Sequence, residues 1–480
     1  MLFNSFQFLI FFPLVTIIYF LLPHKYRWFQ LLVASCIFYM VFIPVYILIL
    51  FLTICIDYVA GIAIENAVGR RRKFLLAISI VTNVGILAVF KYYNFFAENL
   101  NEVFHNIPLL TIALPIGLSF HTFQAMSYTI EVYRGNHRSE RHFGIYALYV
   151  MFFPQLVAGP IERPQNVLHQ FHEKKTFDYA NLTSGLKLIL WGLFKKVVIA
   201  DRISLATNEV FNDPGHQSAL SLIIGTVFFS FQIYCDFSGY SDIALGTARV
   251  LGFKLMKNFD APYQAKNISE FWQRWHISLS TWFRDYLYIS IGGNRVSVPR
   301  WYFNLFFVFL VSGFWHGANW TFLIWGALHG FYLIFAYATS KWRTGFMNIT
   351  GMSKMKWLFN PLQVIITFIL VSFAWIFFRA NSLRDAWTIV RKIITMDGMT
   401  LGKADVHGLP DSYLGLPRWY FGSIILLIIF LLVADFLITR KYVPRLMSVP
   451  LVKYLTYFLL VFAIIFLGVY HNNRFIYFQF

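Results

Sequence analysis

His316 is the residue with the clearest potential for chemistry, because it lies in a run, 301–340, that contains no Lys, Arg, Asp or Glu. An ionisable side chain is costly to bury in apolar surroundings and is by default a functional hypothesis there. Gly313 and Gly317 flank the histidine and leave room for another backbone or a ligand. Spacing alone leaves two interpretations open: a neutral histidine hydrogen-bonded between helices, or a group that transfers protons.

The neighbours of His316 could support such chemistry. Trp315 and Trp320 supply aromatic walls, and Asn319 supplies an amide that can donate or accept hydrogen bonds. His329 follows 13 residues after His316, which is about 220° around a continuous helix, so the two would not form a metal-binding pair. The sequence contains no HExxH or comparable ligand set, and we expect no metal site.

His276 is the second candidate, within the stretch NISEFWQRWHISLSTWFRDYLYISIGGN at 267–294. Asn267 followed by Glu270 is typical of a capping box and predicts a helix that begins near Ile268 and ends near 292–294. The stretch is too polar for a lipid-exposed span and too aromatic for a solvated loop. We therefore expect an interfacial or re-entrant helix that could form a cavity wall. For His276, an interfacial role and a catalytic role both remain open.

The elements that must position these residues are membrane helices. Of the 480 residues, 58% are hydrophobic and only 13% are charged. The runs show no sustained alternation of the kind that a transmembrane barrel requires. Because a span needs roughly 20 residues, we expect about 11 or 12 spans or re-entrant segments in an all-α, polytopic protein. The apolar runs are 3–22, 29–56, 74–90, 107–130, 143–161, 182–194, 219–235, 301–340, 357–378, 419–434 and 454–470.

The run 301–340 is too long for one span. Its 40 residues would make about 60 Å of helix, twice the roughly 30 Å hydrocarbon core. The sequence therefore predicts a break near its middle, close to His316. Broken backbone at membrane depth is tolerated mainly where it is buried in protein or lines a cavity.

The net charge of +18 is better explained by a membrane than by nucleic acid. Basic residues cluster in short connections such as 70–73 and 195–196, as the positive-inside rule and anionic headgroups lead one to expect. This places the N-terminus and the polar central belt at about 249–300 in the cytoplasm. The first apolar run lacks the features of a cleavable signal. Cys36, Cys55 and Cys235 lie in apolar segments and are expected to be small buried hydrophobes.

Other motifs narrow the function class. Asp236 and Asp242 end an apolar run and could contact sugar hydroxyls or cap a helix, of which we favour the structural interpretation. The sequence has no GxSxG elbow, no GxxxxGK[ST] loop and no GxGxxG fingerprint, so a serine hydrolase and a nucleotide-driven machine are unsupported. No soluble domain, linker or internal repeat is visible, and we expect one integral domain over 1–480, with the histidine segment at 301–340.

Several stretches resemble the membrane-bound O-acyltransferase (MBOAT) family, in particular its bacterial alginate O-acetylation branch. The likeness spans nearly the whole chain, and the most specific parts are the central belt and the FWHG sequence. The matching stretches are PQLVAGPIERP at 154–164, YCDFSGYSDIALG at 234–246, the belt at 258–295, SGFWHGANWTFLIWGALHG at 312–330 and RFIYFQF at 474–480.

The resemblance implies a fold and a pair of functional residues. Family members are rings of transmembrane helices around a tunnelled centre, in which a thioester donor arrives from the cytoplasmic side. The FWHG histidine corresponds to His316 and is the implied catalytic residue, with His276 as a second functional position. The family's bacterial branch often works with a periplasmic or membrane-anchored partner of the SGNH-hydrolase type.

The chemistry can also be argued physically. Acyl transfer to a hydroxyl needs a base and a donor for the developing oxyanion. Desolvation should keep His316 neutral and able to act as that base. His276 would position the thioester or stabilise charge, and Asn319 is a candidate oxyanion donor. Arg274, Lys257 and Lys266 would attract an anionic donor, and the further supporting residues are Trp315, Asn267, Trp272, Asp285, Tyr286 and Asp236.

The sequence thus predicts a multi-pass O-acetyltransferase of the bacterial inner membrane that serves a cell-envelope polysaccharide, such as an exopolysaccharide, an alginate-like polymer or peptidoglycan. Its donor would be acetyl-CoA or another acyl thioester, with no bound cofactor. Its partners would be the polysaccharide or an SGNH-type relay protein and membrane lipids, and no nucleic acid. One alternative is an acyltransferase that acts on a lipid or protein. Another is a transporter, which would be expected to show inverted repeats.

Overall fold

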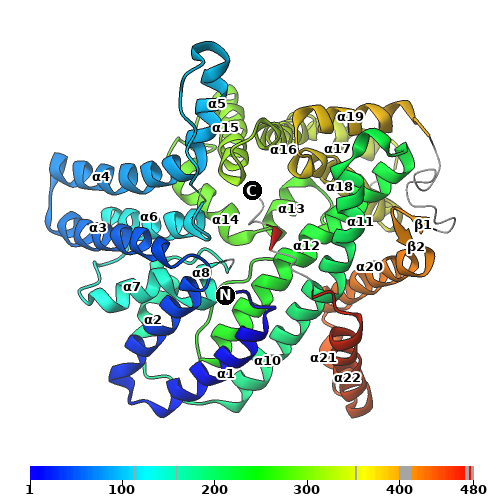
Figure 1. The fold of residues 1–480 in the computed structure, drawn as a ribbon. Helices are drawn as coiled ribbons and strands as arrows, with labels where there is room; N and C mark the ends of the chain where they lie inside the picture. Colours follow the sequence, from blue (N-terminus) through cyan, green and yellow to red (C-terminus); the bar gives the residue numbers. More distant parts are fainter. Residues whose placement is uncertain (113, 158, 352–353, 399–411, 471–474, 477–480) are drawn as a thin grey trace. The chain divides into compact units, whose positions relative to one another are not determined.

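The computed structural model describes residues 1–480 except 113, 158, 352–353, 399–411, 471–474 and 477–480 (Figure 1). The described residues are mostly helical, which confirms the predicted fold class. Strands β1 (Ser412–Tyr413) and β2 (Leu416–Pro417) form a short antiparallel pair in which Ser412 faces Pro417. The chain packs into two compact units, residues 1–192 with 240–257 and residues 193–239 with 258–480. The single domain over 1–480 stays a prediction.

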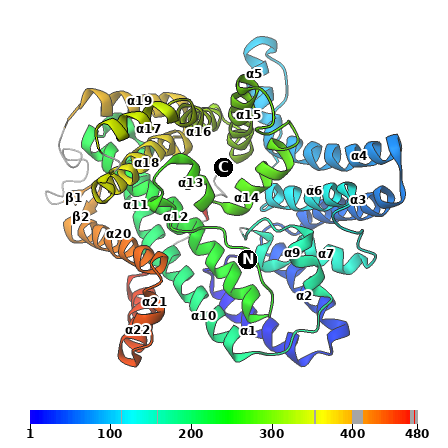
Figure 2. The ribbon, with the colours of Figure 1, turned by 180° about the vertical axis from the view of Figure 1, so that it is seen from behind.

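Unit 1 contains the N-terminal helices. Within it, α3, α4 and α6 lie side by side in both Figure 1 and Figure 2 and contact one another extensively. Its elements are α1 (Phe6–Leu21), α2 (His24–Met40), η1 (Pro44–Tyr46), α3 (Ile47–Asn66), α4 (Gly69–Leu87), η2 (Ala88–Tyr92), α5 (Tyr93–Phe104), α6 (Leu118–Arg134), α7 (Phe143–Met151), α8 (Phe153–Leu156), α9 (Pro164–Val167), η3 (Leu168–Phe171) and most of α10 (Tyr179–Leu193).

A buried polar cluster joins the three packed helices of unit 1. Asp57 on α3 accepts hydrogen bonds from Ser79 at 2.6 Å and from Asn83 at 2.8 Å, both on α4. Ser79 also donates to Thr129 on α6 at 3.0 Å. A buried carboxylate is tolerated only where hydrogen bonds satisfy it, so this cluster fixes which faces of the helices meet.

Unit 2 contains the helices that carry the candidate site. Helix α12 (Ala219–Val250) starts in unit 2 and ends in unit 1. The other elements are η4 (Phe194–Ala200), α11 (Asp201–Asn212), η5 (Pro214–His216), η6 (Pro262–Gln264), α13 (Ile268–Arg274), α14 (Ile277–Trp282), η7 (Phe283–Tyr288), α15 (Val298–His316), α16 (Trp320–Ala338), α17 (Ser340–Ile349), α18 (Lys356–Arg379), α19 (Leu383–Thr395), α20 (Arg418–Thr439), α21 (Val443–Leu446) and α22 (Pro450–Leu467).

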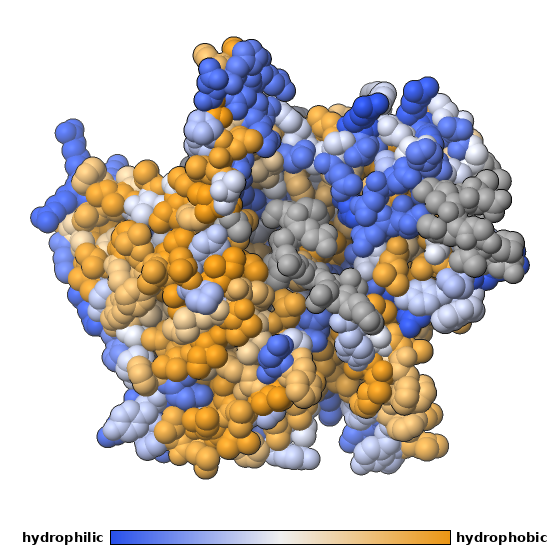
Figure 3. Space-filling view, in the orientation of Figure 1, coloured by the Kyte–Doolittle hydropathy of each residue, from blue (hydrophilic) through white to orange (hydrophobic). Residues whose placement is uncertain are grey.

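Seven helical segments of the described chain are long and apolar enough to cross a membrane. They are Pro44–Asn66, Gly69–Phe104, Ala219–Val250, Trp320–Ala338, Lys356–Arg379, Arg418–Thr439 and Pro450–Leu467. Leu460 is the buried residue of α22, whereas 78% of the apolar part of α12 is buried. Figure 3 shows hydrophobic residues over the side of unit 1 that carries α1, α2 and α3. Apolar surface of this extent suits contact with lipid.

The seven segments are helices of 18 or more residues, whereas the predicted 11 or 12 segments include re-entrant ones, so shorter apolar helices such as α1 are not among the seven. Two of the predicted apolar runs are divided by proline. The run 29–56 is divided at Pro44, where η1 separates α2 from α3. The run 143–161 divides into α7 and α8, with Pro154 in the first turn of the second helix. Proline lacks an amide donor and therefore begins helices more readily than it continues them.

The predicted break in the run 301–340 is confirmed. Helix α15 ends at His316, and α16 begins at Trp320. Asn319 caps the second helix, since its side-chain oxygen accepts from the backbone N–H of Thr321 at 3.0 Å. The chain therefore reverses within three residues of the histidine, and α15 and α16 pack against each other.

Glycines allow this reversal to be tight. A Cβ built on Gly313 would lie 2.3 Å from the carbonyl oxygen of Phe322, and one built on Gly326 would lie 2.3 Å from the carbonyl oxygen of Phe309. Real Cβ atoms do not approach backbone this closely. The small-residue contact thus sets the distance between α15 and α16.

The predicted helix start at Ile268 is also confirmed, with Asn267 as the cap that accepts from the Glu270 N–H at 2.9 Å. The prediction of a continuous helix to 292–294 is wrong. The helix breaks at His276, whose φ of 44° lies in the left-handed region. Asn258, which is remote in sequence, causes the break: its backbone oxygen accepts from the Ile277 N–H at 2.9 Å.

We predict that Gly326→Ala lowers the thermal stability of the protein. The new methyl group must push α15 away, and overpacking of this kind costs about 1–3 kcal/mol. The measurement is Tm in detergent. Gly422→Ala is the matched control, since a Cβ at Gly422 meets no atom within 4 Å and alanine favours helix by up to about 1 kcal/mol. An unchanged Tm for Gly326→Ala would contradict the close-contact interpretation.

Candidate functional site

His316 lies in an aromatic enclosure at the end of α15, and its side chain is buried. Three rings surround the imidazole, with centroids 4.9 Å away for Trp315, 5.0 Å for Trp325 and 5.4 Å for Phe378. All three contact it edge to face. These walls come from α15, α16 and α18, so three helices must pack before the enclosure exists.

A second histidine, His329, shares one wall of this enclosure. Trp325 lies between the two histidines, since its ring centroid is also 5.0 Å from that of His329. The Nε1–H of Trp272 on α13 donates to His329 Nδ1 at 3.3 Å. The hydrogen bond assigns the remaining proton of a neutral His329 to Nε2. Sequence reasoning considered His329 only as a metal ligand, although its spacing of four from Trp325 places both residues on one helix face.

His276 occupies the break between α13 and α14 and is fully buried. Its Nδ1 lies 3.2 Å from the side-chain oxygen of Asn258. That oxygen also accepts from the N–H and the hydroxyl of Ser278, at 3.2 and 2.9 Å. Nδ1 of His276 is therefore the protonated nitrogen, and Nε2 carries the lone pair.

Burial also sets the protonation state of His276. Desolvation lowers the pKa of this imidazole well below its ordinary value of 6.5. Phe237 contacts the ring edge to face at 4.6 Å, and Phe259 lies 6.5 Å from it. His276 is thus a neutral group in apolar surroundings at neutral pH.

Tryptophans connect the surroundings of the two predicted histidines within unit 2. Trp275, next to His276 in the chain, packs on Trp375 with ring centroids 5.1 Å apart. Trp375 in turn stacks on Trp325 at 5.7 Å, and Trp325 is a wall of the His316 enclosure. His276 and His316 therefore belong to one aromatic cluster.

A pocket of about 560 Å³ adjoins this cluster. Trp272 and Phe309, which both contact the ring of His329, line it, and so does Ser312, which is one helical turn before His316. The other lining residues are Ser269, Gln273, Ile277, Leu279, Ser280, Thr281, Phe283, Arg284, Tyr288, Asn294, Trp301, Leu305, Val308, Leu333 and Tyr337. The lining combines apolar rings with hydroxyl and amide groups, which suits an amphipathic ligand.

Other predicted residues have structural contacts. Arg274 forms an ion pair with Glu270 at 2.8 Å and donates to the backbone oxygen of Asp260 at 3.1 Å. Asp285 pairs with Arg284 at 2.7 Å. The ring of Tyr286, which is buried, lies 5.1 Å from that of Trp282. Lys257 and Lys266 are exposed. The roles predicted for these residues stay predictions.

Asp236 lies in the middle of α12 and therefore caps no helix, so the capping interpretation of this residue is wrong. Its carboxylate pairs with the buried Lys196 at 2.6 Å. Sequence reasoning missed Lys196, which reads as part of a basic connection but is 1% exposed. Among the described residues, no three His, Cys, Asp or Glu side chains gather as metal ligands.

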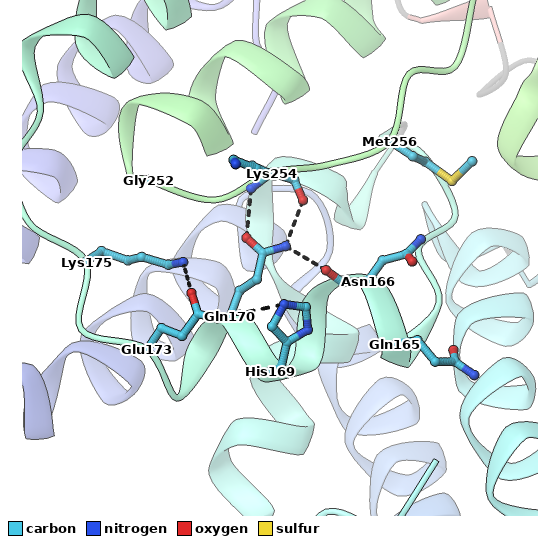
Figure 4. Close-up of a pocket in the computed structure, with 9 residues that line it drawn as sticks. All are labelled: Gln165, Asn166, His169, Gln170, Glu173, Lys175, Gly252, Lys254 and Met256. Atoms are coloured by element: carbon cyan, nitrogen blue, oxygen red, sulfur yellow. Dashed lines mark hydrogen bonds and ion pairs between the residues drawn. The ribbon is translucent and has the colours of Figure 1, made fainter. Parts of the chain in front are cut away.

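Unit 1 has a separate polar pocket of about 510 Å³ (Figure 4). Gln170 lies at its centre and binds both backbone groups of Lys254, donating to the oxygen at 2.9 Å and accepting from the N–H at 2.9 Å. Lys175 pairs with Glu173 at 2.5 Å. These contacts attach the segment after α12 to η3. The polar residues of this pocket therefore have a structural role within unit 1.

The comparison with known protein families matches a range of the chain that contains both candidate histidines. The profile of the MBOAT, membrane-bound O-acyltransferase family matches residues 136–379, a range that includes both His276 and His316. The probable alginate O-acetylase AlgI of Pseudomonas aeruginosa is 39% identical over 85% of this chain and 77% of its own length.

Two further relatives are named as a peptidoglycan O-acetyltransferase and a teichoic acid D-alanyltransferase. The peptidoglycan O-acetyltransferase of Helicobacter pylori is 37% identical over 77% of this chain and 74% of its own length. The teichoic acid D-alanyltransferase of Bacillus subtilis is 29% identical over 55% of this chain and 68% of its own length. The family match and these identities lead to one conclusion: the chain belongs to the membrane-bound O-acyltransferase family and is a multi-pass membrane O-acyltransferase.

Proposed function

We propose that the protein transfers an acetyl group from a cytoplasmic acyl thioester toward hydroxyls of a cell-envelope polysaccharide, either directly or through a periplasmic partner. The observation that carries the proposal is the position of His316, enclosed by aromatic rings at a chain reversal and one turn from the Ser312 wall of the 560 Å³ pocket. The alginate and peptidoglycan relatives support acetyl as the group and a polysaccharide as the acceptor. The bacterial inner membrane is the proposed location.

The reaction requires one base and one oxyanion donor. His316 removes the proton of the acceptor hydroxyl while the hydroxyl oxygen attacks the thioester carbonyl carbon. The tetrahedral intermediate then collapses, the carbon–sulfur bond breaks, and the imidazolium returns its proton to the leaving thiolate. The products are an acetyl ester and a free thiol, so His316 ends the cycle neutral.

Water must be kept away from this reaction, because it would hydrolyse the thioester. The rings of Trp315, Trp325 and Phe378 cover His316 and lower the local dielectric constant. Asn319 is the proposed oxyanion donor. Its side-chain oxygen is fixed as the cap of α16, so its amide N–H groups are held in a defined direction.

The pocket beside the cluster is the proposed donor site. A thioester arm that contains amide groups is amphipathic, and the pocket offers rings together with Ser, Thr, Gln and Asn side chains. His276, which lies in the central belt and is hydrogen-bonded to Asn258, positions the thioester. The donor is acetyl-CoA or another acyl thioester, no cofactor is bound, and a partner of the SGNH-hydrolase type would receive the acetyl group for the final transfer.

His316→Ala is predicted to reduce acetyl transfer at least about 100-fold, since general bases contribute that much or more. The measurements are thiol release from acetyl-CoA by purified protein supplied with envelope polysaccharide, and the ester content of envelope polysaccharide from cells that express the variant. His216→Ala is the control, because this histidine is 81% exposed and pairs with Asp213, three residues earlier. Near-normal turnover by folded His316→Ala would exclude the base assignment.

The polysaccharide fraction also separates the acceptor classes. Ester that depends on His316 in polysaccharide supports the proposal. Ester that depends on His316 only in lipid or protein would redirect it to the alternative acyltransferase. Uptake of a substrate without thiol release would instead support a transporter.

Ser312→Leu is predicted to raise the KM for acetyl-CoA about ten-fold or more, because the larger side chain fills the part of the donor pocket next to His316. Steady-state kinetics of purified protein measure the change. Thr344→Leu serves as the control, since Thr344 is exposed on α17. An unchanged KM would move the donor site away from this pocket.

A further inference from the structure

Three charged side chains form a buried cluster in unit 2. Lys196 lies in the π-helical turn η4, and its Nζ is 2.8 Å from Asp201 and 2.6 Å from Asp236. The three side chains are 1%, 3% and 4% exposed. Removing a lysine and two aspartates from solvent is expensive, and buried ion pairs of this kind are weak evidence for stability alone. We therefore expect the cluster to have a role besides stabilising the fold.

Asp236 uses its other oxygen to bind a distant part of the chain. Its Oδ2 accepts a hydrogen bond from the backbone N–H of Ile476 at 2.7 Å, across 240 positions of sequence. Both oxygens of this carboxylate are thus engaged within the protein, one with Lys196 and one with Ile476. This arrangement does not suit the sugar-hydroxyl contact that the sequence left open for Asp236.

Two more contacts attach neighbouring residues to the same elements. The Val469 N–H donates to the backbone oxygen of Val197 on η4 at 2.9 Å. Arg202 on α11 donates to the backbone oxygen of Leu467 at 2.7 Å, and its guanidinium lies over Tyr420, 4.4 Å from the ring centroid. Leu467, Val469 and Ile476 are therefore all bound along η4, α11 and α12.

The attached residues extend toward His276. Phe475 is fully buried, and its ring centroid lies 5.6 Å from that of Phe237. Phe237 follows Asp236 in the chain and contacts the His276 ring edge to face at 4.6 Å. Contacts therefore run from Lys196 to Asp236 and from Asp236 to Ile476. They continue from Phe475, the neighbour of Ile476, to Phe237, and from Phe237 to His276.

We propose that Asp236, held by Lys196, is a positioning residue that docks Phe475 and Ile476 and thereby fixes Phe237 against His276 for acyl transfer. The proposal rests on the proposed function, because Phe475 and Ile476 can affect acyl transfer in this way only if His276 takes part in the reaction. Asp236 itself touches no substrate. It acts through the backbone of Ile476 and the ring of Phe237.

The most specific test is Ile476→Pro, which removes the N–H that Asp236 binds and leaves the Lys196 cluster intact. We expect kcat for acetyl transfer from acetyl-CoA to fall at least about ten-fold, because small displacements of active-site groups have effects of this size or larger. KM for acetyl-CoA should stay close to that of the unaltered protein. Tm in detergent should fall, because the buried Asp236 carboxylate loses a hydrogen bond, but it should stay above the assay temperature. Tyr470→Phe is the control, since this side chain is exposed.

The pH profile of kcat is a readout that a merely structural role would not move. In the intact protein, burial keeps the pKa of His276 well below 6.5. A loosened Phe237 wall admits water and lets this pKa rise toward 6.5, so His276 becomes protonated at a higher pH. The acid limb of the profile should therefore shift to higher pH in Ile476→Pro.

Phe475→Leu and Phe475→Ala keep the proposal testable if the proline variant does not fold. The leucine variant retains most of the buried volume and should keep more activity than the alanine variant. A folded Ile476→Pro or Phe475→Ala with unchanged kcat and pH profile would overturn the proposal. A fall in kcat that occurs only at temperatures where the variant unfolds would also overturn the proposal. Absence of thiol release from the unaltered protein supplied with acetyl-CoA and envelope polysaccharide would instead overturn the proposed function.

Discussion

The close contact between α15 and α16 is the constraint on which the site depends. Gly313 and Gly326 let backbone meet backbone, and this allows an uncharged run of 40 residues to reverse direction at His316. Without the reversal, Trp325 would lie far along a single helix and could not form a wall of the histidine. Backbone proximity therefore creates the enclosure, and the aromatic side chains only complete it.

Aromatic burial then determines the protonation chemistry. Both functional histidines of the proposal pack against aromatic rings, and for His276 the resulting desolvation disfavours the charged form. The amide side chain of Asn258 orients the His276 ring. In the proposed reaction only His316 takes up a proton, while the neutral His276 holds the thioester in position.

Local sequence signals predicted the local features. The capping residues Asn267 and Asn319 and the break after His316 follow from short-range patterns, and the fold class follows from composition. Features that depend on distant residues could not be predicted in this way. The left-handed His276 depends on Asn258, 18 positions earlier. The burial of Lys196 depends on Asp236 and on a fold that no nearby residue specifies. A basic dipeptide looks the same in a loop and in a core.

His316 is the last residue of α15, so its side chain lies at the carboxyl end of the helix dipole. The unpaired carbonyl groups at the carboxyl end of a helix carry a partial negative charge of roughly half an electron. In the proposed reaction the imidazole becomes cationic only while it holds the hydroxyl proton. The helix terminus would stabilise that brief charge and would do nothing for the neutral resting state. A backbone dipole can thus serve in place of the carboxylate that often accompanies a catalytic histidine, without placing a permanent anion in the membrane.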